Sequence, residues 1–206
     1  VVTTALACLV GLPLVCFGGW EMVLVGAACV LFCFLYTTLL AQHGMGDVLV
    51  LLFFGLVPVC LTYYVTMPPA SQTITAQVVW ASLACGLVID TLLVVNNYRD
   101  YDQDRAVGKK TLIVRMGRER AEQLYGWLGN IATYMMWGCL VLGDSSFVLM
   151  LVCFACFVPY ALLHGATRVQ MRRIGRGKEL NKVLGMTARN MFVFGVTTAI
   201  VTLFIL

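Results

Sequence analysis

The sequence predicts an all-α membrane protein, folded as a polytopic transmembrane helix bundle. Hydrophobic residues make up 61% of its 206 residues and charged residues only 12%, which is about half the charged fraction of a typical water-soluble domain. The apolar residues form unbroken runs, whereas the strands of a membrane barrel alternate apolar and polar positions over about ten residues. The few charges are concentrated in two segments. These three observations exclude a water-soluble fold and favour membrane-spanning helices over a barrel.

Seven apolar stretches are long enough to cross a bilayer, because a hydrocarbon core of roughly 30 Å needs about 20 residues of helix. The run VLVLLFFGLVPVCLTYYV is typical of them. In chain order the stretches are 1–18, 21–40, 47–66, 75–97, 122–142, 147–167 and 184–206. We therefore expect a single transmembrane domain over residues 1–206, without a soluble domain.

All nine cysteines lie within these apolar stretches. Cys153 and Cys156 have the local spacing of a metal-binding pair, but a structural zinc site needs accessible, clustered thiolates and usually a second pair. We interpret the cysteines as small apolar packing residues.

The basic residues define an orientation. Of the 14 lysines and arginines, the segment 98–120 holds seven and the segment 168–182 holds six. Two spans separate these segments, so both lie on one side of the membrane, and the positive-inside rule makes that side cytoplasmic. The net charge of +4 is explained by topology, with attraction to anionic lipid or to an anionic substrate as a further contribution. It does not indicate a nucleic-acid partner.

The stretch NNYRDYDQDRAVGKKT follows an apolar run and carries the densest charge of the chain. Asn96, Asp100 and Asp104 are spaced i, i+4 and i+8, so a helix that continues through them places all three on one face. Two stacked carboxylates and an amide oxygen repel one another unless a cation lies between them, and hard oxygen ligands suit Mg²⁺. The spacing predicts a magnesium site.

Four basic residues accompany these oxygens: Arg99, Arg105, Lys109 and Lys110. Beside a metal site they would balance a multiply charged anion such as a diphosphate, with bidentate contacts from arginine and point charges from lysine. Gly108 permits a tight turn before the two lysines. A diphosphate with a lipid tail would place its head here and its tail between the helices. A solvated loop of mixed charge is the alternative interpretation.

The segment LLVVNNYRDYDQDRAVGKKTLIVRMGRERA, Leu92 to Ala121, resembles the second aspartate-rich region of the UbiA-type membrane prenyltransferase superfamily. Its form is most similar to that of the 1,4-dihydroxy-2-naphthoate polyprenyltransferases of menaquinone synthesis. FLYTT at 34–38, GDVLVLLFFGLVPVCLTYYV at 46–65 and LNKVLGMTARN at 180–190 also resemble family segments. The resemblance covers essentially the whole chain.

The resemblance implies a nine-helix fold with two aspartate-rich motifs, one after helix two and one after helix six. Here the motif follows the fourth predicted span and three spans come after it. We therefore expect the seven spans to correspond to helices three to nine, with the first two helices and the first motif missing. A piece of this kind would be inactive by itself.

The resemblance further implies transfer of a polyprenyl group from polyprenyl diphosphate to dihydroxynaphthoate, with loss of CO₂ and diphosphate, giving demethylmenaquinone. Asn96, Asp100 and Asp104 match the catalytic metal–diphosphate positions, with Mg²⁺ as the cofactor. Tyr36 and Asn97 are candidates for the acceptor pocket. The expected location is a bacterial cytoplasmic membrane, with the active site facing the cytoplasm. Other aromatic acceptors such as 4-hydroxybenzoate or homogentisate, a non-catalytic fragment and a transporter remain as alternatives.

Three further residues have less defined expectations. Asp90 lies inside a predicted span, where carboxylates are costly and often functional; a hydrogen bond to a threonine or asparagine of another helix is the interpretation we prefer. His43 is expected to be a solvated loop residue. His164 is expected to cap a helix or to face the membrane interface.

Overall fold

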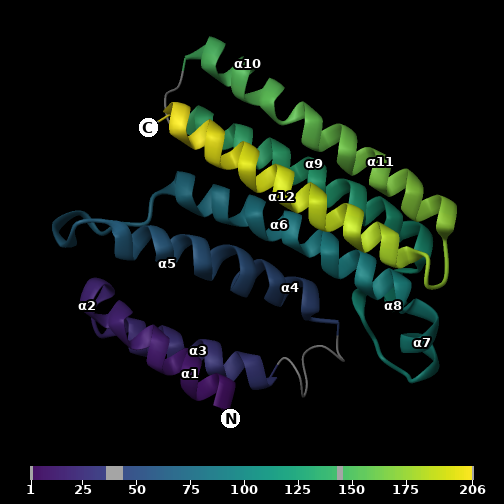
Figure 1. Ribbon diagram of the computed structural model, residues 1–206, viewed down its shortest axis with the longest axis horizontal. Helices are drawn as coiled ribbons and strands as arrows, with labels where there is room; N and C mark the ends of the chain where they lie inside the picture. Colours follow the sequence, from purple (N-terminus) through teal and green to yellow (C-terminus); the bar gives the residue numbers. More distant parts are fainter. Residues whose placement is uncertain (1, 36–43, 143–145, 206) are drawn as a thin grey trace.

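The structure is a computed structural model that describes residues 2–35, 44–142 and 146–205. Every regular element in these ranges is a helix (Figure 1), which confirms the predicted all-α class. Tyr36 and His43 lie outside the described residues, so the expectations for them stay predictions.

The first helices form a hairpin at one edge of the molecule (Figure 1). α1 (Val2–Gly11) continues through a 3₁₀ turn (Leu12–Leu14) into α2 (Val15–Gly18), and α3 (Glu21–Leu35) returns. The chain reverses at Gly19, whose φ of 76° is a conformation that favours glycine. Within the described residues both arms are apolar helices of fewer than 18 residues.

The next helix is continuous but changes its winding in the middle. α4 (Gly46–Val50) passes through a π-helical segment (Leu51–Leu56) into α5 (Val57–Thr66). Gly55 of this segment lies against Gly86 of the following helix, where an added Cβ would come within 2.8 Å of the Gly86 Cα. The two backbones therefore approach as closely as small residues allow, a packing mode typical of membrane helices.

The remaining helices build the larger part of the bundle. α6 (Ala76–Arg99) begins at Thr75, whose Oγ1 accepts a hydrogen bond from the Val78 N–H. After it come α7 (Tyr101–Ala106), α8 (Leu112–Met116), α9 (Arg118–Leu142), α10 (Phe147–Cys156), α11 (Val158–Ile174) and α12 (Leu180–Ile205). α6 lies between the α4–α5 helix and α12, and α10 and α11 form the opposite edge from α1–α3 (Figure 1).

In the part of the chain that the structure describes, four helices are long and apolar enough to cross a membrane: Gly46–Thr66, Ala76–Arg99, Phe147–Ile174 and Leu180–Leu203. Together with the shorter apolar helices they support an integral membrane protein. α9 has 25 residues but a more polar sequence. Each of the seven predicted stretches is represented by helix, although α11 ends seven residues later than its stretch does. α11 continues past residue 167 because its arginine side chains can keep their guanidinium groups in water while the helical backbone stays hydrogen-bonded.

The two basic segments meet at one end of the bundle. The Arg118 Nη1 donates to the Gly175 carbonyl at 2.6 Å, and the Arg99 Nη1 donates to the Asn181 Oδ1 at 3.1 Å. This confirms that residues 98–120 and 168–182 lie on one side, and we refer to this side as the basic end. Its assignment to the cytoplasm stays a prediction.

Candidate functional site

The helix that carries the predicted metal ligands breaks at Asp100. α6 ends at Arg99, Asp100 has φ −89° and ψ 5°, and α7 begins at Tyr101. The backbone N–H of Asp100 still donates to the Asn96 carbonyl (3.1 Å), and that of Asp104 donates to the Asp100 carbonyl (2.8 Å). Helical hydrogen bonds between residues four apart therefore persist on each side of the break. The predicted uninterrupted helix through Asn96, Asp100 and Asp104 does not form.

Arg99 gathers the first two predicted oxygen ligands around one cation. Its Nε donates to the Asp100 Oδ1 at 2.7 Å, and its Nη2 donates to the Asp100 Oδ2 at 2.8 Å and to the Asn96 Oδ1 at 2.9 Å. The fourth acceptor is the Asn181 Oδ1 at the start of α12. These hydrogen bonds from Arg99 lower the pKa of the Asp100 carboxyl below its usual value, so Asp100 is ionised at neutral pH.

Asp104 has a different cationic partner. The Lys109 Nζ lies 3.0 Å from its Oδ1, and the Lys109 backbone N–H donates to the Asp104 carbonyl at 2.9 Å. Gly108, with φ 77°, forms the turn that brings Lys109 back, as predicted. Asp104 is nearly buried, whereas Lys109 is exposed and so are Arg105 and Lys110. The structure thus brings basic groups and carboxylates together at the basic end. It does not place the side chains of Asn96, Asp100 and Asp104 around one cationic group.

These residues fit a magnesium site in part. Asn96 and Asp100 already direct three oxygens at one cationic group, and Asp104 adds a carboxylate a turn away. Within the described ranges there is no group of three or more His, Cys, Asp or Glu side chains that could hold a metal ion. Two carboxylates and an amide oxygen match the few protein ligands that Mg²⁺ takes when phosphate oxygens supply the rest.

Arg118 holds the break in place, a role that the charge pattern of the sequence did not indicate. Its guanidinium lies 4.8 Å from the ring centroids of both Tyr98 and Tyr101, which flank Asp100. Its Nη1 also donates to the Tyr98 carbonyl at 3.1 Å, and its Nη2 pairs with Asp102 at 3.0 Å. An arginine stacked between aromatic faces, with both terminal nitrogens hydrogen-bonded, fixes the direction in which α7 leaves α6.

The pairing expected for Asp90 is not formed. Asp90 is only 2% exposed, and its Oδ1 has no hydrogen-bond partner in the described part of the chain, so the predicted bond to a threonine or asparagine is wrong for that atom. The carboxylate that acts on it electrostatically is Asp47 of α4, whose Oδ1 is also buried and unpartnered among the described residues. The feature of the sequence that could have pointed to Asp47 is an acidic residue at the start of an apolar run.

The start of α4 lies against the end of the charged stretch. A Cβ on Gly44 would come within 2.6 Å of the Lys110 carbonyl, and Gly44 has φ 76°. Only glycine allows this contact. The chain that carries Lys109 and Lys110 therefore folds back over the α4–α6 side of the bundle, the side that contains Asp47 and Asp90.

His164 is buried in the bundle, so the expected cap or interface position is wrong. Its Nε2 lies 2.9 Å from the Tyr125 carbonyl, and its ring stacks on Tyr125 with centroids 4.4 Å apart. Nearby, the Asn190 Nδ2 donates to the Thr167 Oγ1 at 2.8 Å. The middle of α11 faces α9 and α12, which a hydropathy pattern does not reveal.

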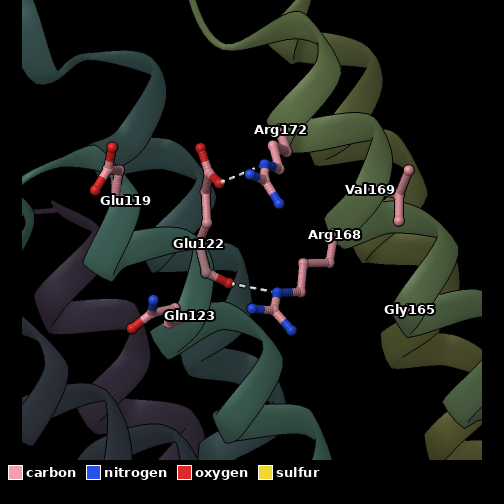
Figure 2. Close-up of a pocket in the computed structure, with 7 residues that line it drawn as sticks. All are labelled: Glu119, Glu122, Gln123, Gly165, Arg168, Val169 and Arg172. Carbon is pink, nitrogen blue, oxygen red and sulfur yellow. Dashed lines mark hydrogen bonds and ion pairs between the residues drawn. The ribbon is translucent and has the colours of Figure 1, made fainter.

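The cavity shown in Figure 2 lies between α9 and α11. It has a volume of about 810 Å³, and its lining residues are Glu119, Glu122, Gln123, Gly165, Arg168, Val169 and Arg172. None of the predicted ligands lines it. One hydrogen bond connects this cavity with the α6–α7 break: the Tyr98 hydroxyl, beside the break, donates to the Oε1 of Glu122, which lines the cavity, at 2.8 Å.

Asn97, the second asparagine of the motif, is half-buried near the end of α6. Of the residues predicted for the site, the structure therefore joins Asn96, Arg99 and Asp100, pairs Asp104 with Lys109, and leaves Arg105 and Lys110 exposed.

Comparison with known proteins gives consistent matches over most of the chain. The model of the UbiA prenyltransferase family matches residues 1–184. The chain is 34% identical over 204 residues to the 1,4-dihydroxy-2-naphthoate octaprenyltransferase of Mycobacterium tuberculosis (strain ATCC 25618 / H37Rv), covering 95% of this chain and 64% of that protein. It is 32% identical over 207 residues to the protein of the same name from Mycobacterium leprae (strain TN), covering 97% and 65%.

A third relative with that name, from Escherichia coli (strain K12), is 30% identical over 171 residues, covering 79% of this chain and 48% of that protein. The chain thus spans between about half and two thirds of the length of these three relatives. No solved structure gives a significant match.

Proposed function

Because the chain belongs to the UbiA prenyltransferase family, we propose that the protein transfers a polyprenyl group from a polyprenyl diphosphate to 1,4-dihydroxy-2-naphthoate. In this reaction CO₂ and diphosphate are lost, and the prenylated dihydroxynaphthalene that forms is the reduced (quinol) form of a demethylmenaquinone. The names of the relatives support this acceptor. The structural observation that carries the proposal is the convergence of Asn96 and Asp100 oxygens on one cationic group at the basic end.

The diphosphate would bind among the basic side chains of the charged stretch. Lys109 and Arg99 are now neutralised by Asp104 and Asp100. Arg99 would release Asp100 when magnesium is held by Asn96, Asp100 and Asp104, and its guanidinium would then face the diphosphate. When bound, the metal supplies positive charge to the leaving diphosphate. Exposed Arg105 and Lys110 add to the positive field that attracts the substrate.

Bond making and breaking need no side-chain nucleophile. The allylic C–O bond breaks and its electron pair leaves with the diphosphate, so an allylic carbocation remains. The ring carbon that bears the carboxylate attacks this cation, a C–C bond forms, and the electrons of the C–CO₂ bond return to the ring as CO₂ departs. Apolar helices around the tail exclude the water that would otherwise trap the cation. Asn97 and Tyr36 are our candidates for contacts to the acceptor.

An assay of membranes in which the product of the complete open reading frame is expressed tests the proposal. We expect Asp100→Asn and Asp104→Asn each to reduce release of diphosphate and CO₂ by at least about a hundredfold, since each removes a charged ligand from the developing negative charge. Glu179→Gln is the matched control: it removes one exposed carboxylate from the same end of the bundle and should leave turnover unchanged.

Two results would contradict the proposal. Full activity in both aspartate variants would exclude the site. Faster turnover of 4-hydroxybenzoate or homogentisate than of dihydroxynaphthoate would leave the site in place but exclude the proposed acceptor.

A further inference from the structure

A polar groove lies between α9 and α11 (Figure 2), and none of the residues proposed for catalysis lines it. The cavity at the basic end continues into a second one of about 430 Å³, because both are lined by Gln123 and Arg168. The second cavity extends past Gly126 and Trp127 to Asn130. From Glu119 to Asn130 the groove follows about 16 Å of helix.

Arg168 forms the centre of this groove. It lies six residues before the end of α11, within a helix long and apolar enough to span a membrane. Its Nε donates to the Glu122 carbonyl at 2.9 Å, the one hydrogen bond that Arg168 makes to the described residues. The terminal nitrogens therefore keep free N–H groups that face the groove. This exposed guanidinium makes no ion pair with the described residues, so it is available to an anionic group of a ligand.

A glycine makes room for this arginine. A Cβ on Gly126 would come within 2.9 Å of the Arg168 Cδ and Nη1, so the guanidinium lies directly over the glycine. Gly165 on α11 also lines the cavity and leaves it open. The position of Arg168 therefore depends on a small residue at 126 as well as on the Glu122 carbonyl.

The groove carries both signs of charge. Arg172, 3.9 Å from the Glu122 carboxylate, adds a second cation, and that carboxylate also accepts the Tyr98 hydroxyl. Glu119 on the same wall has no ion pair among the described residues. Apolar side chains border the polar ones: Trp127 is 63% exposed and Val169 is 51% exposed. Tryptophan at such a position is typical of the membrane interface.

We propose that this groove binds a membrane phospholipid whose head group carries both a phosphate and a primary ammonium, as in phosphatidylethanolamine. The phosphate would face Arg168 and Arg172, the ammonium would face Glu119, and an acyl chain would lie along Trp127. The balance of two acidic and two basic side chains matches a head group without net charge. An anionic head group would leave Glu119 opposite a negative charge. The open side and the apolar rim select a lipid over a soluble phosphate.

Native mass spectrometry of the purified protein tests this, with dioleoyl-phosphatidylethanolamine, phosphatidylcholine and phosphatidylglycerol added in separate titrations. We expect phosphatidylethanolamine to bind most tightly. Arg168→Gln should weaken that binding by about tenfold, since one charge-assisted contact is lost. Gly126→Ala should act in the same direction by displacing the guanidinium while every charge is kept. Glu119→Gln should remove the preference for phosphatidylethanolamine over phosphatidylcholine.

Arg173→Gln is the matched control, because Arg173 is an exposed arginine five residues further along α11 but does not line the groove. It should bind phosphatidylethanolamine as the wild type does. Circular dichroism confirms that each variant is folded. An equal loss of phosphatidylethanolamine affinity in Arg173→Gln and Arg168→Gln would overturn the proposal. Tighter binding of phosphatidylglycerol than of phosphatidylethanolamine, or the absence of any lipid preference, would also overturn it.

Discussion

Arg99 and Asp100 form the most completely paired contact of the candidate site. A bidentate arginine–carboxylate pair is stronger than a single contact, and here the arginine also reaches Asn96 and Asn181. The arginine that would neutralise a diphosphate is thus the group that occupies the proposed metal ligands in the structure.

The lowered pKa of Asp100 gives a pH dependence. Because Arg99 lowers this pKa in the folded protein, the pair stabilises the fold above the unfolded value of about 3.9, and this contribution is lost as the pH falls through the folded value. We expect Arg99→Gln to show a smaller loss of thermal midpoint between pH 6 and about pH 3 than the wild type does, as measured in detergent. Asn181→Ala, which removes the Arg99–Asn181 bond and keeps the pair, should retain the wild-type profile.

Asp47 and Asp90 are two buried carboxyl groups that act on each other electrostatically. Replacing either with asparagine removes a carboxyl group that is costly to ionise in this buried place, together with its interaction with the other carboxyl group, while preserving the side-chain shape. We expect Asp47→Asn and Asp90→Asn each to raise the thermal midpoint at pH 7.5, with little further gain in the double variant, because the two effects are coupled. Additive gains would show that the carboxylates act independently, and a lower midpoint in both single variants would indicate that each charge has a stabilising partner.

Among the helices, the α4–α5 helix and α6 approach each other backbone to backbone at their crossing. An added Cβ at Gly55 would meet backbone atoms, the Gly86 Cα and the Ser82 carbonyl, both at 2.8 Å. Backbone does not move aside as a flexible side chain does. The π-helical segment Leu51–Leu56 contains Gly55, so the irregular winding and the close approach occur at the same place.

Gly55→Ala should therefore separate these helices and destabilise the protein by about 1–3 kcal/mol, the usual range for overpacking. Gly185→Ala in α12 is the control, because a Cβ there meets nothing within 4 Å; it should stabilise by about 0.5–1 kcal/mol through helix propensity. Thermal unfolding in one detergent measures both. An equal change in stability in the two variants would contradict the close approach of the two backbones at this crossing.

For the molecule as a whole, Arg118 joins segments far apart in the sequence. One side chain contacts the α6–α7 break, Asp102 of α7 and the Gly175 carbonyl after α11. Lysine keeps the charge but loses the planar stacking and the forked donors.

We expect Arg118→Lys to destabilise the fold by about 1–3 kcal/mol, and Asp102→Asn to have a much smaller effect, since Asp102 is 61% exposed. Chemical denaturation in detergent, followed by tryptophan fluorescence, distinguishes them. A similar effect of the two variants would show that the Asp102 ion pair, rather than the backbone and ring contacts, holds this end together.

The sequence alone determined the helical membrane class, the meeting of the two basic segments at one end, and the grouping of Asn96, Asp100 and Asp104 with basic residues. These follow from hydropathy, charge and a period of 3.6 residues, which are properties of neighbouring positions. Only the tertiary structure decided that the helix breaks at Asp100, that Asp90 is buried within electrostatic reach of Asp47, that His164 is buried, and that Arg118 and Asn181 complete the basic end. These contacts join residues up to 82 positions apart, and their partners are chosen by how whole helices pack, which no local pattern specifies.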